Sequence, residues 1–341
     1  MSGAGVRAGS DTDTAPEFPS TVGGMSTPVF PAILTLTMNP ALDVSTSTEK
    51  VSPEHKLRCG ATRLDPGGGG VNVSRVVHRL GGRTRAVYAV GGLTGGTYRS
   101  LIEAEGVPTV AVPIAGETRE SFTVDELSTG EQFRFVLEGP RLSDTEWSDC
   151  LDTVVAQFPG HGFVIASGSL PPGVPDDFYA RVAREAGKAG LRTVVDASGD
   201  ALAAALEEGV YLVAPSRREL ATLVGHPLDG ESELVEAATE LVRRGSAECV
   251  ALTLGGAGAV LATADGIIRM PVPQVKVQST VGAGDSFLGA FVLRVAQGRG
   301  VRDAMRSAVA AGSATAMTPA TELCTPDDVA ALEAQLESAG H

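Results

Sequence analysis

Cysteine, histidine and long apolar runs are all scarce in this chain of 341 residues. Its four cysteines (Cys59, Cys150, Cys249 and Cys324) are widely separated and form no Cys-x-x-Cys pair, so we expect reduced thiols and no zinc site. The five histidines show no spacing that is typical of metal ligands. No apolar run approaches the ~20 residues that a membrane-spanning helix needs. Because no secretory signal is visible, the sequence predicts a cytoplasmic protein that binds no membrane.

The chain also lacks a dense run of basic residues. Its 41 Asp and Glu against 27 Lys and Arg give a formal net charge of −14, and the isoelectric point is near 4.8. This excess of acid argues against nonspecific binding to nucleic acid or to anionic membranes. A small anionic substrate would therefore have to be bound by local arginine, lysine and backbone N–H groups.

The order of the expected elements predicts one large domain. Residues 1–29 are rich in Gly, Ser, Thr, Pro and Asp, and we expect them to be a disordered tail. Residues 30–341 are expected to form an α/β domain, because strands alternate with helices as in a mostly parallel sheet with helices on both faces. Two stretches, about 50–65 and 117–138, interrupt this rhythm with strands that carry polar faces. We expect them to form a small β-sheet lid.

The expected elements can be given by residue range. Strands of the main sheet are expected at 32–37, 85–90, 162–167, 191–196, 210–213, 249–254 and 258–262, and lid strands at 56–64, 120–127 and 132–137. Helices are expected at 71–80, 96–105, 143–157, 175–189, 199–207, 217–224, 231–243, 282–297 and 301–315.

The most informative motif is Thr280–Ser286 (Thr-Val-Gly-Ala-Gly-Asp-Ser), which opens a long apolar helix. Its small residues let backbone N–H groups crowd around an anion at the helix N-terminus. A carboxylate in that turn would repel phosphate, so it is better suited to accept a proton from a hydroxyl that attacks the phosphate. The expected anion hole is Gly282, Ala283 and Gly284, and the expected general base is Asp285. A glycine-rich helix start capped by an acid is the structural alternative.

A second motif, Asp65–Val73 (Asp-Pro-Gly-Gly-Gly-Gly-Val-Asn-Val), follows a strand and opens a helix. Four successive glycines cost much backbone entropy, which indicates close contact with a ligand or a hinge, although a flexible turn is the alternative. Asn72 could offer a donor and an acceptor to sugar hydroxyls. Val73 and Ser74 occupy the positions where a dinucleotide fingerprint would need glycine, and no P-loop motif is present.

Polar residues elsewhere could complete a site for a sugar phosphate. Asp43 follows the first strand, at the sheet edge where ligands bind, and could hold two hydroxyls or simply form a turn. Arg119 precedes a lid strand and could contact a phosphate through two nitrogens, or be a solvated surface residue. Lys56, on the first expected lid strand, has the same two interpretations.

Two further stretches could serve a nucleotide. The turn Thr253–Gly258 (Thr-Leu-Gly-Gly-Ala-Gly) could approach an adenine ring or phosphates closely, although a plain hairpin explains it almost as well. Ser216 and Glu219 lie at the start of one helix, where they could hold Mg²⁺ through water. A capping box, in which the two residues satisfy each other's backbone N–H groups, is the strong alternative.

Together, the glycine run and the Val-Gly-Ala-Gly-Asp-Ser motif resemble the two signatures of the PfkB/ribokinase family of carbohydrate kinases. The resemblance covers about residues 32–335. The segments 37–43, 56–59 and 167–173 are similar to those of the PfkB-type 6-phosphofructokinases. The resemblance implies a ribokinase-like α/β fold with a β-sheet lid. It also implies ATP- and Mg²⁺-dependent phosphorylation of fructose 6-phosphate at its C1 hydroxyl, giving fructose 1,6-bisphosphate.

The resemblance assigns a role to each candidate residue. Asp285 would deprotonate the C1 hydroxyl, and the backbone of Gly282, Ala283 and Gly284 would stabilise the γ-phosphoryl group in transfer. The implied substrate-binding residues are Asp43, Lys56, Gly68, Gly69, Asn72, Arg119 and Ser169, and the implied nucleotide-binding residues are Ser216, Thr253, Gly255 and Gly258. Glu219 would bind Mg²⁺ through water, Ser279 and Val281 fit a potassium loop, and the lid would form a homodimer contact.

This chain also departs from the family pattern. Ala214 and Ser216 stand where relatives usually have Lys and Asn, and Glu322 stands where relatives often have Arg. We expect Arg217 or Arg218 to replace the missing charge at the nucleotide. The alternative activities are those of a tagatose-6-phosphate kinase and a fructose-1-phosphate kinase, and the non-enzymatic alternative is a sensor that binds a sugar phosphate.

Overall fold

A computed structural model describes residue 1 and residues 30–339, so all of the expected tail except residue 1 lies outside the described residues. Within the described part, nine strands form one sheet in the order β13-β12-β11-β10-β9-β8-β1-β4-β5. All neighbours pair in parallel except β11 with β12 and β12 with β13. The strands are β1 (Ala32–Thr37), β4 (Thr84–Val90), β5 (Thr109–Pro113), β8 (His161–Ser167), β9 (Arg192–Asp196), β10 (Val210–Val213), β11 (Ala247–Thr253), β12 (Ala259–Thr263) and β13 (Gly266–Met270).

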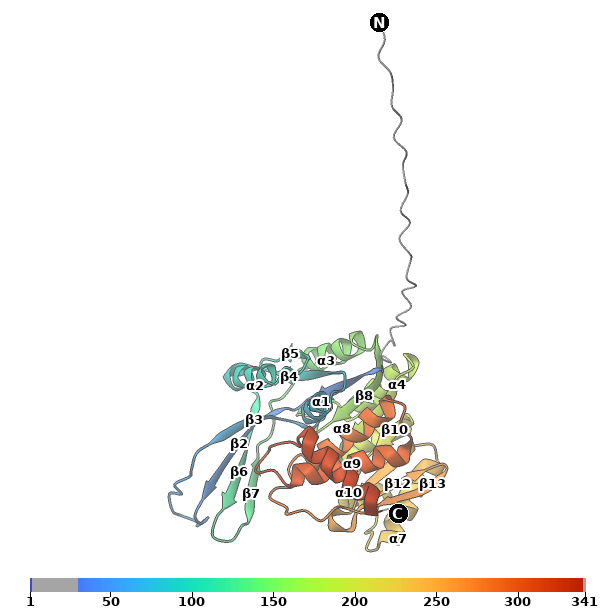
Figure 1. Cartoon of the computed structure of the whole chain (residues 1–341). Helices are drawn as coiled ribbons and strands as arrows, with labels where there is room; N and C mark the ends of the chain where they lie inside the picture. The colour runs from blue at the N-terminus through green and yellow to red at the C-terminus, as the bar shows by residue number, and fades with distance from the viewer. Residues whose placement is uncertain (2–29, 340–341) are drawn as a thin grey trace.

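Helices cover both faces of this sheet, as predicted (Figure 1). Every residue of β1 is buried, and its side chains alternate between the two hydrophobic cores, with Ile33 in one and Leu34 in the other. The first core contains α3 (Asp144–Ala156), α4 (Phe178–Lys188), α5 (Gly199–Glu207), α6 (Arg217–Val224) and α7 (Glu231–Arg243). The second contains α1 (Gly69–Arg79), α8 (Ala283–Ala296), α9 (Val301–Ala316) and α10 (Pro326–Ala339), while α2 (Gly92–Ala104) packs near β4.

A second, smaller sheet extends from the main body of the molecule (Figure 1). Its order is β3-β2-β6-β7, with β2 and β6 parallel and the other pairs antiparallel. The strands are β2 (Ala41–Thr48), β3 (Arg63–Gly67), β6 (Arg119–Glu126) and β7 (Gln132–Val136). We call these four strands the lid. The ribokinase-like architecture of a large, mostly parallel sheet with a small second sheet therefore agrees with the sequence prediction.

The expected first lid strand was placed wrongly. Residues 56–62 form no strand, and β3 begins only at Arg63. The alternative interpretation of Asp43 as a turn residue is wrong, because this residue lies within β2 and is paired with Asp65 of β3. The preceding Asn-Pro pair resembles a turn signal, but its strand partners decide the conformation of this segment.

Three elements of the main domain were not predicted. The edge strand β5 carries Pro113, which is tolerated at a sheet edge but obscures a strand pattern. Strand β13 returns from β12 through a tight turn and pairs antiparallel to it. Helix α10 packs on α9. No helix between residues 30 and 339 is both long and apolar enough to cross a membrane.

Candidate active site

The first turn of α8 lies between two cavities of the described structure. Gly282 and Asp285 line a cavity of about 280 Å³, which we call the lid cavity because lid strands form part of its wall. Ala283 and Gly284 line a second cavity of about 500 Å³, which we call the loop cavity. Gly282 precedes the helix with φ of 74°, a left-handed conformation that glycine adopts without strain. A group in either cavity can therefore reach the same helix N-terminus.

Asp285 is held by a residue of the glycine-run helix. Its Oδ2 atom accepts a hydrogen bond of 2.9 Å from Nδ2 of Asn72, on α1. Burial raises the pKa of the Asp285 carboxyl to about 7, and the negative charge of Asp196 raises it further, while the Asn72 hydrogen bond opposes this. A carboxyl group whose pKa is near 7 can accept a proton at neutral pH and release it again.

The glycine run allows the backbone at the end of β3 and the start of α1 to approach polar side chains of two other strands closely. A Cβ atom at Gly69 would lie 2.0 Å from Oγ of Ser167, and one at Gly67 would lie 2.1 Å from Oδ2 of Asp43. Gly68 has φ of 115° and faces Thr37. The run therefore lines the lid cavity with backbone.

Asp43 lines the lid cavity together with Gly68, Gly69 and Asn72. Burial raises the pKa of the Asp43 carboxyl to about 6, although the positive charge of Arg134 on β7 opposes the shift. Arg134 lies in none of the motifs described above. A signal for it existed, because alternation along β7 places Arg134 on the face opposite Phe135.

Asp196 also lines the lid cavity, next to Ser167 at the ends of two neighbouring strands. Oγ of Ser167 donates a hydrogen bond of 2.8 Å to Oδ2 of Asp196. Burial raises the pKa of this carboxyl as well, with the Ser167 hydrogen bond acting against the shift. Three carboxyl groups, those of Asp43, Asp196 and Asp285, thus line one small cavity.

Arg119 and Ser169 come together at an adjoining cavity of about 740 Å³, which we call the outer cavity. Arg119 also lines the lid cavity, so it connects the two spaces. Its guanidinium donates to the carbonyl oxygens of Asn39, at 3.0 and 3.3 Å, and of Leu137, at 3.0 Å. Ser169 accepts a hydrogen bond from Asn39. Lys56 is exposed and lines none of the three cavities.

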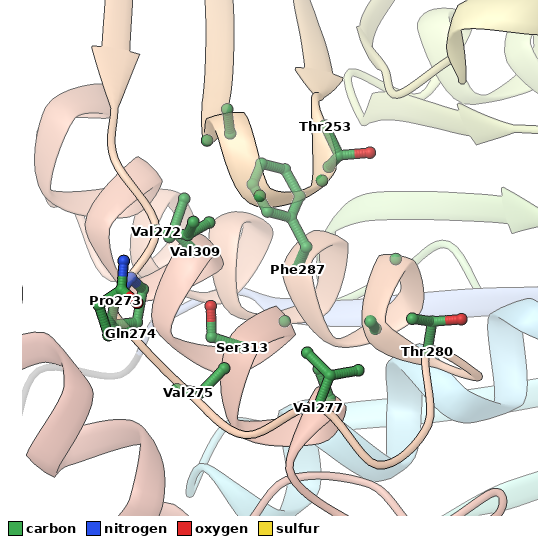
Figure 2. A pocket seen from close by; sticks show the side chains of 18 residues that line it. Thr253, Val272, Pro273, Gln274, Val275, Val277, Thr280, Phe287, Val309 and Ser313 are labelled. Atoms are coloured by element: carbon green, nitrogen blue, oxygen red, sulfur yellow. The ribbon is translucent and has the colours of Figure 1, made fainter. Parts of the chain in front are cut away.

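The loop cavity contains the expected nucleotide turn. Thr253, Gly255 and Gly258 line it, opposite a segment that follows β13 and that the sequence analysis missed (Figure 2). Most of the remaining wall is apolar, which suits the face of a flat aromatic ring. The labelled apolar side chains in Figure 2 are Val272, Pro273, Val275, Val277, Phe287 and Val309.

Ser216 and Glu219 form a capping box at the start of α6. Oγ of Ser216 accepts from the Glu219 N–H at 3.3 Å, and Oε2 of Glu219 accepts from the Ser216 N–H at 2.7 Å. Neither residue lines the loop cavity. Arg217 donates to the carbonyl oxygens of Leu228 and Asp229, so its guanidinium stabilises a neighbouring loop. In residues 30–339, no three His, Cys, Asp or Glu side chains gather where they could hold a metal ion.

The loop before α8 contains the two residues that fit a potassium site. Ser279 is buried, and its Oγ accepts a hydrogen bond of 3.2 Å from the backbone N–H of Val281. Nearby in the fold, Glu322 forms an ion pair of 2.9 Å with Arg63 of the lid strand β3. Glu322, which stands where relatives often have Arg, is therefore paired with a cationic side chain in this protein.

A family model described as "pfkB family carbohydrate kinase" matches residues 35–328. The chain belongs to the PfkB family of carbohydrate kinases. It is therefore an enzyme of the phosphotransferase class, as the sequence predicted. The match contains both the glycine run and the first turn of α8, which line the lid cavity together.

Two relatives of this PfkB kinase carry the same name, ATP-dependent 6-phosphofructokinase isozyme 2. The Mycobacterium tuberculosis protein is 46% identical over 299 residues, which are 88% of this chain and 88% of the relative. The Escherichia coli protein is 41% identical over 305 residues, or 89% and 98% of the two chains.

Solved structures of E. coli phosphofructokinase-2 have the same fold as this PfkB kinase. Its complex with potassium superposes with a TM-score of 0.86 and 40% identity, covering 90% of this chain and 99% of that one. Its complex with fructose-6-phosphate gives a TM-score of 0.85 at 39% identity, with the same coverage. A structure of its tetrameric inhibited form gives 0.85 at 40% identity and the same coverage.

Proposed function

We infer that this PfkB kinase transfers the γ-phosphoryl group of ATP to the C1 hydroxyl of fructose 6-phosphate. The observation that carries the inference is the position of the α8 N-terminus between the polar lid cavity and the largely apolar loop cavity. A sugar phosphate in the first and ATP in the second would meet at the backbone N–H groups of Gly282, Ala283 and Gly284. The names of the relatives with 46% and 41% identity support the same substrates.

In this proposal Asp285 accepts the proton of the C1 hydroxyl as the sugar oxygen forms its bond to the γ-phosphorus. The bond from that phosphorus to the β,γ-bridging oxygen breaks, and ADP leaves. The helix N-terminus compensates the negative charge on the phosphoryl oxygens during transfer. Asp43 and Asn72 hold sugar hydroxyls, with Gly68 and Gly69 against the ring.

Arg119 and Ser169 bind the phosphate of the substrate at the outer cavity in this scheme, because they supply a cation and a hydroxyl there. Lys56 is assigned to the same phosphate only by the family resemblance. Thr253, Gly255 and Gly258 hold the nucleotide. The proposed reaction assigns the chain to carbohydrate metabolism in the cytoplasm.

Two cations complete the proposal. Mg²⁺ retains several waters in protein sites and binds mainly to substrate phosphates, which agrees with the lack of a three-ligand cluster among residues 30–339. Glu219 would contact it through water, and Ser216 would lie on the nucleotide side. For potassium, we propose the loop that contains Ser279 and Val281, supported by the potassium complex of the E. coli protein.

The activity is tested by measuring ADP release from ATP and Mg²⁺ with a panel of sugars: fructose 6-phosphate, fructose 1-phosphate, tagatose 6-phosphate and ribose. We expect a strong preference for fructose 6-phosphate. A preference for fructose 1-phosphate or tagatose 6-phosphate would agree with the proposed mechanism but contradict the proposed substrate. Binding of a sugar phosphate without turnover of any sugar would mean that the chain is a sensor.

The pKa of Asp285 predicts how activity depends on pH. Below about pH 7 the carboxyl holds a proton and cannot accept another, so kcat/KM should rise with pH and level off above about 7. A profile of kcat/KM between pH 5 and 9 measures this, with a pH titration of fructose 6-phosphate alone as the control for ionisation of its phosphate. A limb with its midpoint near the ordinary pKa of aspartate would contradict the assignment.

We also propose a homodimer formed through the lid. Leu64 and Phe135 are exposed apolar residues on lid strands, and a thin sheet that exposes such residues is typical of an interface. The E. coli relative also assembles, in a tetrameric inhibited form. Phe135→Lys should shift the chain toward monomer in sedimentation equilibrium. The matched control is Leu93→Lys, which replaces an even more exposed leucine on α2; equal behaviour of the two variants would contradict a lid interface.

A further inference from the structure

Arg75 is a buried charged residue that the scheme above does not use. It lies on α1, three residues after Asn72, and only 1% of it is exposed. A guanidinium remains charged at all physiological pH values, and burying an unpaired charge is very unfavourable. The groups that contact the Arg75 guanidinium should therefore indicate its role.

The Arg75 side chain joins three parts of the site. Its Nε and Nη2 atoms lie 2.8 and 2.6 Å from Oε1 of Glu105, which follows α2. Its Nη1 atom donates to the carbonyl oxygen of Pro66 and to Oδ1 of Asn72, both at 3.1 Å. Its Nη2 atom is also 3.9 Å from the carboxylate of Asp65 in the lid strand β3. Glu105 balances the positive charge through Nε and Nη2, and Nη1 is the atom that donates to Asn72.

The contact with Nη1 determines which way the Asn72 amide points. A guanidinium has donors and no acceptor, so the amide must present its oxygen to Arg75 and its NH₂ group to Asp285. The opposite orientation would direct the NH₂ group at a donor and the amide oxygen at a carboxylate. Both of those contacts are repulsive, so Arg75 and Asp285 together select the observed orientation.

The orientation of Asn72 in turn selects one oxygen of Asp285. Oδ2 accepts the Asn72 hydrogen bond, at 2.9 Å. Oδ1 lies on the side of the glycine run, because a Cβ atom at Gly69 would be 3.3 Å from it. Oδ1 is therefore the oxygen available to a hydroxyl in the lid cavity.

We propose that Arg75 is a positioning residue for the kinase reaction, which acts through the Asn72 amide to hold Asp285 with Oδ1 toward the acceptor hydroxyl. This inference rests on the proposed function, in which Asp285 is the base. The buried ion pair of Arg75 with Glu105 would then orient the Asp285 side chain as well as stabilise the fold.

The charged groups around Asp285 add an electrostatic consequence. Burial raises the pKa of Asp285, and the carboxyl groups of Asp196 on β9 and Asp43 on β2 raise it further. The Asn72 hydrogen bond and the positive charge of Arg75, both from α1, lower it. Removing the Arg75 charge should therefore move the acid limb of the kcat/KM profile to higher pH.

The test compares Arg75→Lys with the matched control Arg79→Lys. Arg79 lies one turn further along α1 and also pairs with Glu105, at 3.1 Å, but its other contact is the carbonyl oxygen of Leu323. We expect Arg75→Lys to lower kcat by roughly tenfold to a hundredfold, the scale of a small misplacement at the reacting atoms. Arg79→Lys should change kcat by less than about twofold, within the usual small cost of a part-exposed pair. Equal losses of kcat in the two variants would overturn the proposal.

A double-mutant cycle separates positioning from general damage to the fold. If Arg75 acts through Asn72, then Arg75→Lys should have almost no further effect on kcat in an Asn72→Ala background. The same loss of kcat in both backgrounds would overturn the proposal. Thermal unfolding of each variant, with and without ATP, identifies any variant that does not fold. A second cycle that combines Asn72→Ala with Arg79→Lys serves as the control.

A measurement that does not depend on catalysis can test the role of Arg75 separately from the proposed kinase activity. The ¹³C resonance of the Asp285 carboxyl, assigned by its loss in Asp285→Asn, reports the pKa of the group directly. We expect that pKa to rise in Arg75→Gln and to stay near the wild-type value in Arg79→Gln. Absence of fructose 6-phosphate turnover in the wild type would reject the proposed function only. An unchanged pKa in folded Arg75→Gln would reject the role of Arg75.

Discussion

Asp285→Asn should lower kcat for phosphorylation of fructose 6-phosphate by about 10²–10⁴-fold, the usual contribution of a general base. The substitution retains the size of the side chain but removes its ability to accept a proton. The fold should not suffer, because burial already disfavours the charged form of this carboxyl and raises its pKa to about 7. Steady-state kinetics at saturating ATP, with thermal unfolding in parallel, measures both effects.

Asp43→Asn is the matched control for this prediction. Asp43 is another carboxyl of the lid cavity whose pKa burial raises, to about 6, but in our scheme it only binds sugar hydroxyls. Its replacement should raise KM for the sugar more than it lowers kcat, because the base is intact. A kcat of Asp285→Asn within tenfold of the wild type would reject Asp285 as the base.

Gly69→Ala should damage both the lid cavity and the stability of the chain. The new Cβ atom would lie 2.0 Å from Oγ of Ser167 and would displace that side chain from its hydrogen bond with Asp196. We expect the free energy of unfolding to fall by about 1–3 kcal/mol, which is typical of overpacking. The KM for fructose 6-phosphate should rise as well, because the backbone at this position faces the ligand in our scheme.

Gly96→Ala is a suitable control for the glycine prediction. Gly96 lies inside α2, and a Cβ atom there would meet nothing within 4 Å. Alanine at that position should stabilise the chain by about 0.5–1 kcal/mol, because glycine is a poor residue for a helix interior. Chemical denaturation of both variants gives the comparison. If Gly69→Ala were as stable and as active as Gly96→Ala, the close packing of the glycine run would not matter for function.

Much of this protein could be predicted from the sequence because its signals are local. Apolar strands that are buried on both faces have few polar interruptions, and amphipathic helices between them leave a clear periodicity. Those patterns predicted the parallel sheet with helices on both faces, including α5 (Gly199–Glu207) and β10 (Val210–Val213) at the bounds that the structure has. Glycines beside two helix starts likewise made Asp285 and Asn72 candidate site residues, and the fold brings the two side chains within 2.9 Å.

The features that the sequence did not reveal depend on partners that are distant along the chain. Strand β2 exists because it pairs with β3 and β6, and its own residues resemble a turn followed by a polar segment. Ser216 and Glu219 are a different case, because their contact is local to the first turn of α6. Two explanations were open for that pair, and the structure shows the capping box, while their proposed contacts with nucleotide and Mg²⁺ are still predictions.

The electrostatics of the site were decided by tertiary structure alone. In sequence, Arg75 and Arg134 are two arginines among many. One becomes the buried partner of Asn72 and the other lines a cavity with three carboxyl groups only after α1, β7 and the sheet edges meet. A motif can identify the residue that carries out a reaction, because its chemistry resides in its own side chain. The residues that orient that side chain and set its pKa act through distance and burial, which only the folded chain determines.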